Sequence, residues 1–177
     1  VRSVVGRVSS VLTESGRLPP ELTAAEIDTK FAELARLFAA EGNFAEGLSR
    51  RRNTHIFIES LGRTGLVFAK ALSASAVGTL LTLDQQRVSN KDCLPLGHPR
   101  LSIGLPRATS AKTQLENTQL QFHSRRSRSL DTVTAAVLIA NDIVDPNSYQ
   151  TWLARDVPHL AICFDEEGVE ISPLVLP

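Results

Sequence analysis

Apolar residues at the start of the chain follow a helical spacing. Two predicted helices, over residues 1–12 and 23–38, each gather their apolar side chains on one face, because positions three or four apart lie side by side on a helix. Thr23 and Glu26 have the spacing of a capping box. Residues 1–48 are therefore predicted to form a small helical segment of the winged-helix type. Its apolar stripes consist of Val1, Val4, Val5, Val8, Val11 and Leu12, and of Ile27, Phe31, Leu34, Leu37 and Phe38.

After this segment, short apolar runs alternate with amphipathic stretches. An apolar run without polar positions is typical of a parallel strand covered on both faces. Strands that alternate with helices predict an α/β fold with a Rossmann-like parallel sheet, here over residues 49–177. The expected strands are 55–58, 80–83, 120–122, 134–140, 159–164 and, exposed, 168–172, and the expected helices are 62–78, 109–120 and 145–153.

Two features mark the boundaries of these elements. Gly78 is predicted to end its helix in a left-handed conformation, which glycine adopts without steric cost. The charged run at 49–53 is interpreted as a solvated linker, and contact with a phosphate group near a nucleotide site is the alternative.

Composition narrows the class of protein. The 177 residues are 42% hydrophobic and 21% charged, and the formal net charge is zero. Such a chain folds into a globule, and its charge favours neither nucleic acid nor a membrane surface as a partner. No apolar run approaches the roughly 18–20 residues of a membrane span. Cys93 and Cys163 follow no metal-ligand spacing, which favours a reducing, cytoplasmic setting.

A glycine-containing turn follows the strand at 55–58. It has the form S-x-G-x-x-G, with Ser60 in the first position and Gly62 and Gly65 in the other two. In dinucleotide-binding units the second glycine lets the backbone approach phosphate, and the third lets the helix pack on the strand. Asp84 lies about twenty residues further on, where an acid can bind ribose hydroxyls. Ser60 would cost about 1 kcal/mol if its position required a positive φ.

A second group of polar residues follows the strand at 134–140. Asn141 and Asp142 are expected at the same sheet edge as the turn, because ligands of open α/β sheets lie beyond the carboxyl ends of the strands. Asp142 could hold Mg²⁺ on a triphosphate. The alternative is an Asx turn at the end of a strand.

Several of these motifs together resemble the ThiF/MoeB family of adenylate-forming enzymes, which are related to ubiquitin-activating enzymes. The element Ile103-Gly104-Leu105-Pro106-Arg107-Ala108 carries the likeness more specifically than the glycine turn. The ending, His159-Leu160-Ala161 and Ile171 to Pro177, resembles actinobacterial ThiF-like cyclodehydratase or leader-peptide-binding proteins. The matching residues are Gly62-Arg63-Thr64-Gly65, Val77 to Leu80, Leu83-Asp84, Val88, 103–108, 159–161 and 171–177.

The resemblance implies a role for each candidate site residue. Gly62, Arg63 and Gly65 would form the turn around the nucleotide, Asp84 would bind ribose and Arg107 phosphate. Asp142 would coordinate Mg²⁺. The family's S-N-L-x-R stretch supplies an asparagine and an arginine to the triphosphate, but here Asp92 and Pro95 stand in those places. Losing a cation and gaining a carboxylate argues against adenylation, which needs positive charge on the transferring phosphates.

The expected function is therefore that of a degenerate ThiF-like protein in ribosomal-peptide modification. It would bind a precursor or leader peptide for a partner cyclodehydratase, and the resemblance also implies homodimers. ATP and Mg²⁺ are the implied cofactors of the ancestral site, and zinc is implied only for a C-x-x-C part beyond Pro177. The alternatives are an active ATP-dependent adenylyltransferase that activates a carboxylate, and an NAD-sensing repressor with a winged helix and a Rossmann domain.

Overall fold

The computed structural model describes residues 44–115, 119–122 and 128–176. The helices predicted over 1–12 and 23–38 lie outside these ranges. The chain divides into two compact units, Val1–Arg52 and Asn53–Pro177. None of the helices in the described part is long and apolar enough to cross a membrane.

In the first unit, helix α3 (Phe44–Arg52) covers most of the charged run predicted to be a linker. The linker interpretation is therefore wrong for residues 49–52. Arg50, Arg51 and Arg52 form the last turn of the helix, where positive charge interacts favourably with the helix dipole.

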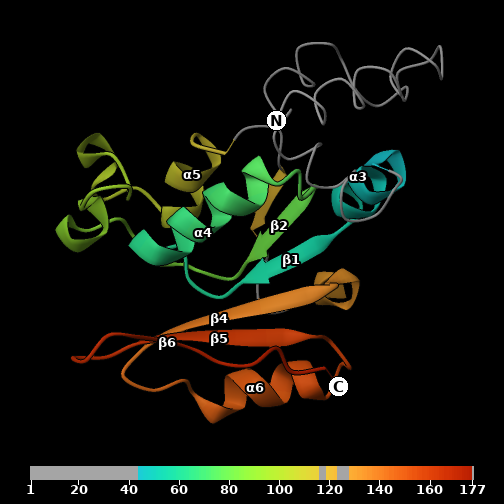
Figure 1. Ribbon diagram of the computed structural model, residues 1–177. Helices are drawn as coiled ribbons and strands as arrows, with labels where there is room; N and C mark the ends of the chain where they lie inside the picture. The colour runs from blue at the N-terminus through green and yellow to red at the C-terminus, as the bar shows by residue number, and fades with distance from the viewer. Residues whose placement is uncertain (1–43, 116–118, 123–127, 177) are drawn as a thin grey trace, which may run out of the picture. The chain divides into compact units, whose positions relative to one another are not determined.

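The second unit is a six-stranded sheet, in the order β3-β2-β1-β4-β5-β6 among the described residues (Figure 1). All neighbouring strands are parallel except β5 and β6. The predicted α/β fold class with a Rossmann-like parallel sheet is confirmed. The strands are β1 (His55–Ile58), β2 (Thr79–Thr82), β3 (Gln119–Phe122), β4 (Ala135–Asn141), β5 (His159–Phe164) and β6 (Val169–Ile171).

The strand order reverses between β1 and β4. From β1 the chain continues outward to β2 and β3, then returns to place β4 on the other side of β1. At such a point the loops leaving the two strands diverge, which opens a crevice at their carboxyl ends.

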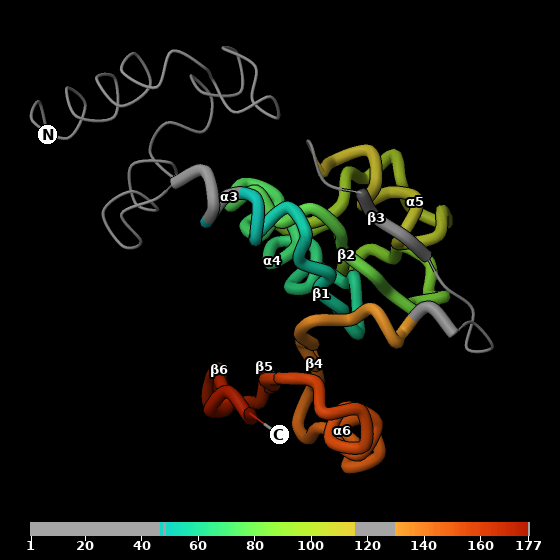
Figure 2. The backbone as a smooth tube through the Cα atoms, turned by 90° about the vertical axis from the view of Figure 1, so that its right-hand side faces the viewer, coloured from blue at the N-terminus to red at the C-terminus, as the bar shows by residue number. Residues whose placement is uncertain are grey.

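Helices cover both faces of the sheet. Figure 2 shows α4 (Arg63–Ala74) and α6 (Pro146–Leu153) on opposite sides of the strands. Strand β1 serves both cores, because successive side chains point to opposite faces: Phe57 packs with Trp152 of α6, and Ile58 packs with Leu66 of α4. α5 (Arg107–Lys112) joins the α4 side through Ala108 and Ala111.

Two helix ends differ from the prediction. α4 ends at Ala74, and Ala76 rather than Gly78 takes the left-handed conformation, with φ +66°. The chain turns this early because Val77 must enter the core, where it is buried. α5 ends at Lys112 instead of residue 120, because residues from 119 onward pair with β2.

Short 3₁₀ turns occupy the connection between β2 and α5, namely η1 (Asn90–Cys93) and η2 (Arg100–Ser102). A third, η3 (Arg128–Thr132), precedes β4. Asp145 caps α6, where its side chain accepts a hydrogen bond from the Asn147 N–H at 2.9 Å, as predicted for a helix that begins with proline.

Candidate functional site

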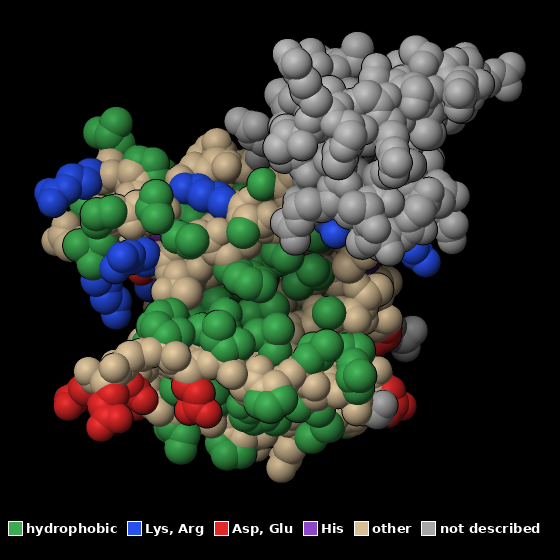
Figure 3. Space-filling model, in the orientation of Figure 1, with side chains coloured by type: hydrophobic (Ala, Val, Ile, Leu, Met, Phe, Trp, Pro, Cys, Tyr) green, Lys and Arg blue, Asp and Glu red, His purple; other side chains and the backbone are tan. Residues whose placement is uncertain are grey.

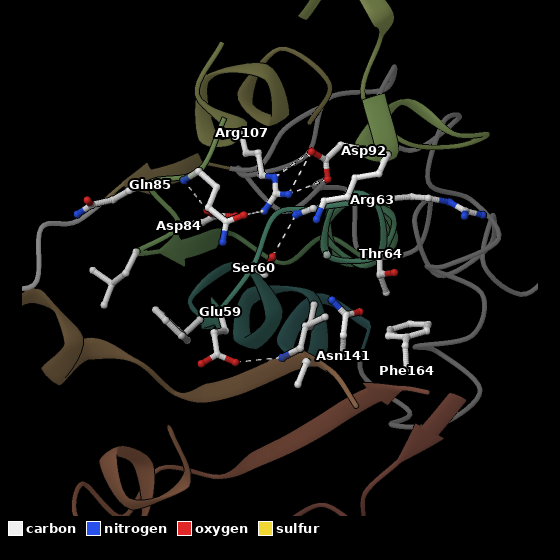
Figure 4. A pocket seen from close by; sticks show the side chains of 18 residues that line it. Glu59, Ser60, Arg63, Thr64, Asp84, Gln85, Asp92, Arg107, Asn141 and Phe164 are labelled. Carbon is white, nitrogen blue, oxygen red and sulfur yellow. Dashed lines mark hydrogen bonds and ion pairs between the residues drawn. The ribbon is translucent and has the colours of Figure 1, made fainter. Parts of the chain in front are cut away.

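A cavity of about 810 Å³ opens at the carboxyl ends of β1 and β4, where the strand order reverses. The turn from β1 to α4 forms one wall. The end of β2, the 3₁₀ turn η1 and the start of α5 form a second wall, and the ends of β4 and β5 form a third. Figure 4 shows how its labelled residues surround the cavity: Glu59, Ser60, Arg63, Thr64, Asp84, Gln85, Asp92, Arg107, Asn141 and Phe164.

The turn accommodates serine in its first position without strain. Ser60 is not among the described residues with positive φ, so the predicted conformational cost does not arise. Its hydroxyl accepts a hydrogen bond from the Gly62 N–H at 3.3 Å. This bond occupies one of the N–H groups that a glycine-rich turn would otherwise offer to a phosphate.

Gly65 is indispensable to the turn for a steric reason. A Cβ atom there would lie 1.7 Å from the carbonyl oxygen of Ser60, well inside any permitted contact. At Gly62 the nearest atom to an added Cβ is the Asp92 Oδ1, at 3.4 Å, which is an ordinary contact. The close packing of helix on strand that the sequence predicted for the third position is therefore present.

Asp84 fastens the turn to the end of β2. Its Oδ2 accepts from the Leu61 N–H and its Oδ1 from the Gln86 N–H, both at 2.8 Å. The residue is buried. Its carboxylate therefore already has backbone partners on both oxygens, in addition to lining the cavity where a ribose was expected.

Arg107 is buried beneath the turn and surrounded by acceptors. Its Nη2 donates to Asp92 Oδ1 at 2.8 Å, and its Nη1 donates to Gln86 Oε1 at 2.8 Å. A longer ion pair joins Nη1 to Asp84 Oδ2 at 3.4 Å. Two carboxylates thus neutralise the cation that was expected to bind phosphate (Figure 4).

Asp92 is held as a carboxylate in this environment. Burial would raise its pKa, but hydrogen bonds from the backbone and hydroxyl of Ser89, together with the Arg107 guanidinium, outweigh burial and lower the pKa below its ordinary value. Both Ser89 groups donate to Oδ2 at 2.8 Å. Asp92 Oδ1 also faces Gly62 at the start of α4, a position where a helix favours an anion.

Sequence reasoning missed two residues that join elements around the cavity, and one of them, Glu59, lines it. Glu59 follows β1 and accepts hydrogen bonds from the Ile139 N–H at 3.2 Å and from the Ser148 hydroxyl at 2.6 Å, so it bridges β4 and α6. The signal was available, because a charged residue that follows a buried strand at a topological reversal must face the crevice.

His98 is the other missed residue. It is buried, with Nε2 2.8 Å from the Leu61 carbonyl and Nδ1 2.8 Å from the Ser110 hydroxyl. Since a carbonyl only accepts, Nε2 carries a proton. His98 therefore links the turn to α5 through these two contacts. No motif in the sequence predicted this role.

Asp142 lies apart from the other predicted site residues. It lines a separate cavity of about 210 Å³, together with Tyr149 and Glu170, and does not line the larger one. Its φ of +66° turns the chain at the end of β4, and Asn141 is the residue that borders the large cavity. Within the described ranges no group of three His, Cys, Asp or Glu side chains could hold a metal ion.

The structure therefore brings together five of the six predicted residues, Gly62, Arg63, Gly65, Asp84 and Arg107, around one cavity. Arg63 is exposed at its edge. The expected Mg²⁺ ligand is not among them, and Asp92 lies between the turn and Arg107.

The chain resembles known proteins in its structure. No family model and no curated protein sequence matches the chain. The crystal structure of PaaA superposes with a TM-score of 0.74 at 16% identity, over 97% of this chain and 63% of PaaA. E. coli MccB superposes with a TM-score of 0.67 at 15% identity, over 90% of this chain and 49% of MccB. The chain has a ThiF-like fold.

The likeness extends to MccB structures with ligands. A complex of MccB, described as a microcin C7 biosynthetic enzyme, with N-formylated MccA gives a TM-score of 0.65 at 15% identity, over 84% of this chain and 47% of MccB. MccB with ATP gives a TM-score of 0.63 at 16% identity, over 82% of this chain and 48% of MccB. The chain thus spans less than two thirds of PaaA and about half of MccB, and the likeness at these identities concerns the fold.

Proposed function

We propose that this chain is a ThiF-like protein of ribosomal-peptide modification that binds a precursor peptide and presents it to a separate cyclodehydratase. It does so without activating a carboxylate with ATP. The observation that carries the proposal is the closed ion-pair network of Arg107, Asp92 and Asp84 at the cavity expected to hold the nucleotide.

The charge balance around the cavity does not fit a triphosphate. Phosphoryl chemistry requires cations on the transferring phosphates. Here the buried cation Arg107 is already paired with two carboxylates. The carboxylate of Glu59 adds a further acidic group beside β4. The cations at the edge, Arg63 and Lys91, are exposed, where water and salt screen them.

The residues around the larger cavity do not form a binding site for Mg²⁺ either. Asp142, the implied ligand, lies on the smaller cavity, and the described residues that line the larger one offer Mg²⁺ only carboxylates already bonded to Arg107 or to backbone and hydroxyl groups. The peptide part of the proposal is supported by the MccB structures solved with MccA.

An active adenylyltransferase is the second candidate. The size of the cavity, its place beside the glycine turn and the likeness to MccB solved with ATP favour it. In that case Arg107 would have to exchange Asp92 for a phosphate when the nucleotide binds.

The two functions differ in one reaction, the ATP-dependent exchange of labelled pyrophosphate. We expect the purified full-length protein, supplied with Mg²⁺, ATP and a library of peptides with free carboxyl termini, to show no exchange above that of a denatured sample. Exchange above that background would establish the adenylyltransferase and end the binding-only proposal. Asp142→Asn then tests separately whether Asp142, on the smaller cavity, takes part in the exchange.

A further inference from the structure

The connection between β2 and α5 exposes large apolar side chains to solvent. We call residues 85–106 the β2–α5 lobe. Leu101 is 98% exposed and Leu96 is 74% exposed. Folded proteins seldom hold so many large aliphatic groups in water on one segment unless something covers them. The exposed apolar residues of the lobe are Leu94, Leu96, Leu101, Ile103 and Leu105.

The backbone of the lobe is fixed, so these side chains do not collapse onto the core. The buried Asp92 and His98 are joined by a hydrogen bond from the His98 N–H to the Asp92 carbonyl at 2.8 Å. Gly97 fits between them because a Cβ there would lie 2.1 Å from that carbonyl oxygen. Leu96 is held with φ +70°, and Lys70 of α4 donates to its carbonyl oxygen at 3.3 Å.

The charge of the lobe has one sign. Its exposed charged residues are Arg87, Lys91 and Arg100, and its sole acid, Asp92, is buried against Arg107. Figure 3 shows Lys and Arg side chains interleaved with hydrophobic ones over this lobe, which is yellow-green in Figure 1. Aliphatic groups among cations are complementary to a segment that combines acidic and apolar side chains.

We propose that the β2–α5 lobe is the surface on which this protein binds its peptide, and that the bound segment is acidic and apolar. The inference rests on the proposed peptide-binding function and specifies its substrate class. A second copy packed symmetrically on this surface would set three cations against three, which costs binding energy. An acidic partner has no such cost.

The test uses the full-length protein and a short fluorescein-labelled peptide of glutamate and leucine as the probe, followed by fluorescence anisotropy. Three matched peptides replace glutamate with glutamine, glutamate with lysine, or leucine with serine. We expect the glutamate–leucine peptide to bind best, with each replacement weakening binding about fivefold or more. Raising NaCl from about 0.05 M to about 0.5 M should weaken it as well.

Variants locate the surface. Leu101→Ser should weaken the probe about fivefold or more, whereas Ile143→Ser, at a residue 78% exposed outside the lobe, should not. Arg100→Glu should weaken the glutamate peptide and strengthen the lysine peptide. Because these side chains are exposed, the variants are expected to keep the thermal stability of the parent.

Three outcomes would overturn the inference: equal binding of the glutamine peptide, equal effects of Leu101→Ser and Ile143→Ser, or a dimer in sedimentation that Leu101→Ser dissociates. The last would assign the lobe to a second copy. If pyrophosphate exchange occurs and the probe binds normally, the proposed binding-only function is wrong but the lobe remains the peptide-binding surface. If no exchange occurs and Leu101→Ser leaves probe binding unchanged, only the assignment of the peptide to the lobe is wrong.

Discussion

Gly65→Ala is expected to lower the free energy of unfolding by about 3 kcal/mol, the upper part of the usual range for overpacking. The added methyl would lie 1.7 Å from the Ser60 carbonyl oxygen and 3.2 Å from the Ile139 side chain. The first of these neighbours is backbone, so the variant can relieve the clash only by moving the turn or α4. Urea denaturation followed by far-UV circular dichroism measures the loss.

Gly62→Ala is the matched control for this substitution. The nearest atom to its methyl group would be 3.4 Å away, and Gly62 has φ −58°, which alanine adopts readily. We expect a loss below about 1 kcal/mol, chiefly because alanine is a poorer residue than glycine at the start of a helix. Equal urea midpoints for the two variants would show that the third glycine of the turn is not required for steric reasons.

Arg107→Met is expected to destabilise the protein by about 3–5 kcal/mol at neutral pH, the usual cost of removing one partner from a buried ion pair. The substitution leaves Asp92 and Asp84 buried without their shared cation. The double variant Arg107→Met with Asp92→Asn removes both charges of the tighter pair and should recover part of the loss. Chemical denaturation of the parent, both single variants and the double variant forms the cycle that measures the coupling.

Acid titration provides a second measurement, on the Asp92 carboxylate of this pair. The pKa of Asp92 is lowered in the folded state, so the unfolded chain binds its proton at higher pH than the folded one. The hydrogen bonds from Ser89 and the Arg107 guanidinium therefore stabilise the fold through the Asp92 carboxylate above the ordinary pKa of an aspartate, and this stability is lost as the pH falls through the lowered value. Asp92→Asn should lack this part of the pH dependence. An unchanged profile would contradict the lowered pKa of Asp92, and a double variant no more stable than Arg107→Met would contradict the pairing.

The strands were predictable because a parallel sheet covered on both faces demands continuous apolar runs. The run at 159–164 coincides with β5, and that at 134–140 is displaced by one residue from β4. The helix expected over 109–120 was too long, since its local pattern does not reveal that residues from 119 onward are needed beside β2. Pairing between distant segments prevailed there over local preference.

The candidate site was predictable where spacing along the chain determines position in space. Gly65 and Asp84 follow two adjacent parallel strands, so they meet at one sheet edge. The pairing of Arg107 with Asp92 could not be predicted, because both residues lie around an irregular connection whose path depends on tertiary packing. Likewise the end of β4 was located, but a positive φ at Asp142 decides which residue faces the cavity.

We propose that Asp92 keeps this site from holding a nucleotide triphosphate. Its Oδ1 lies between Gly62 and the Arg107 guanidinium, where a phosphate oxygen of a bound nucleotide would find both a helix N-terminus and a cation. In the proposed account the Asp92 carboxylate takes the place of that phosphate oxygen beside Arg107.

Isothermal titration of Mg²⁺–ATP into the parent protein and into Asp92→Asn, with folding checked by circular dichroism, measures whether Asp92 closes the site. The parent should show no binding stronger than about 1 mM. Asp92→Asn, with Arg107 released, should bind about tenfold more tightly or better, which corresponds to about 1.4 kcal/mol. Micromolar binding by the parent that Asp92→Asn leaves unchanged would contradict the account.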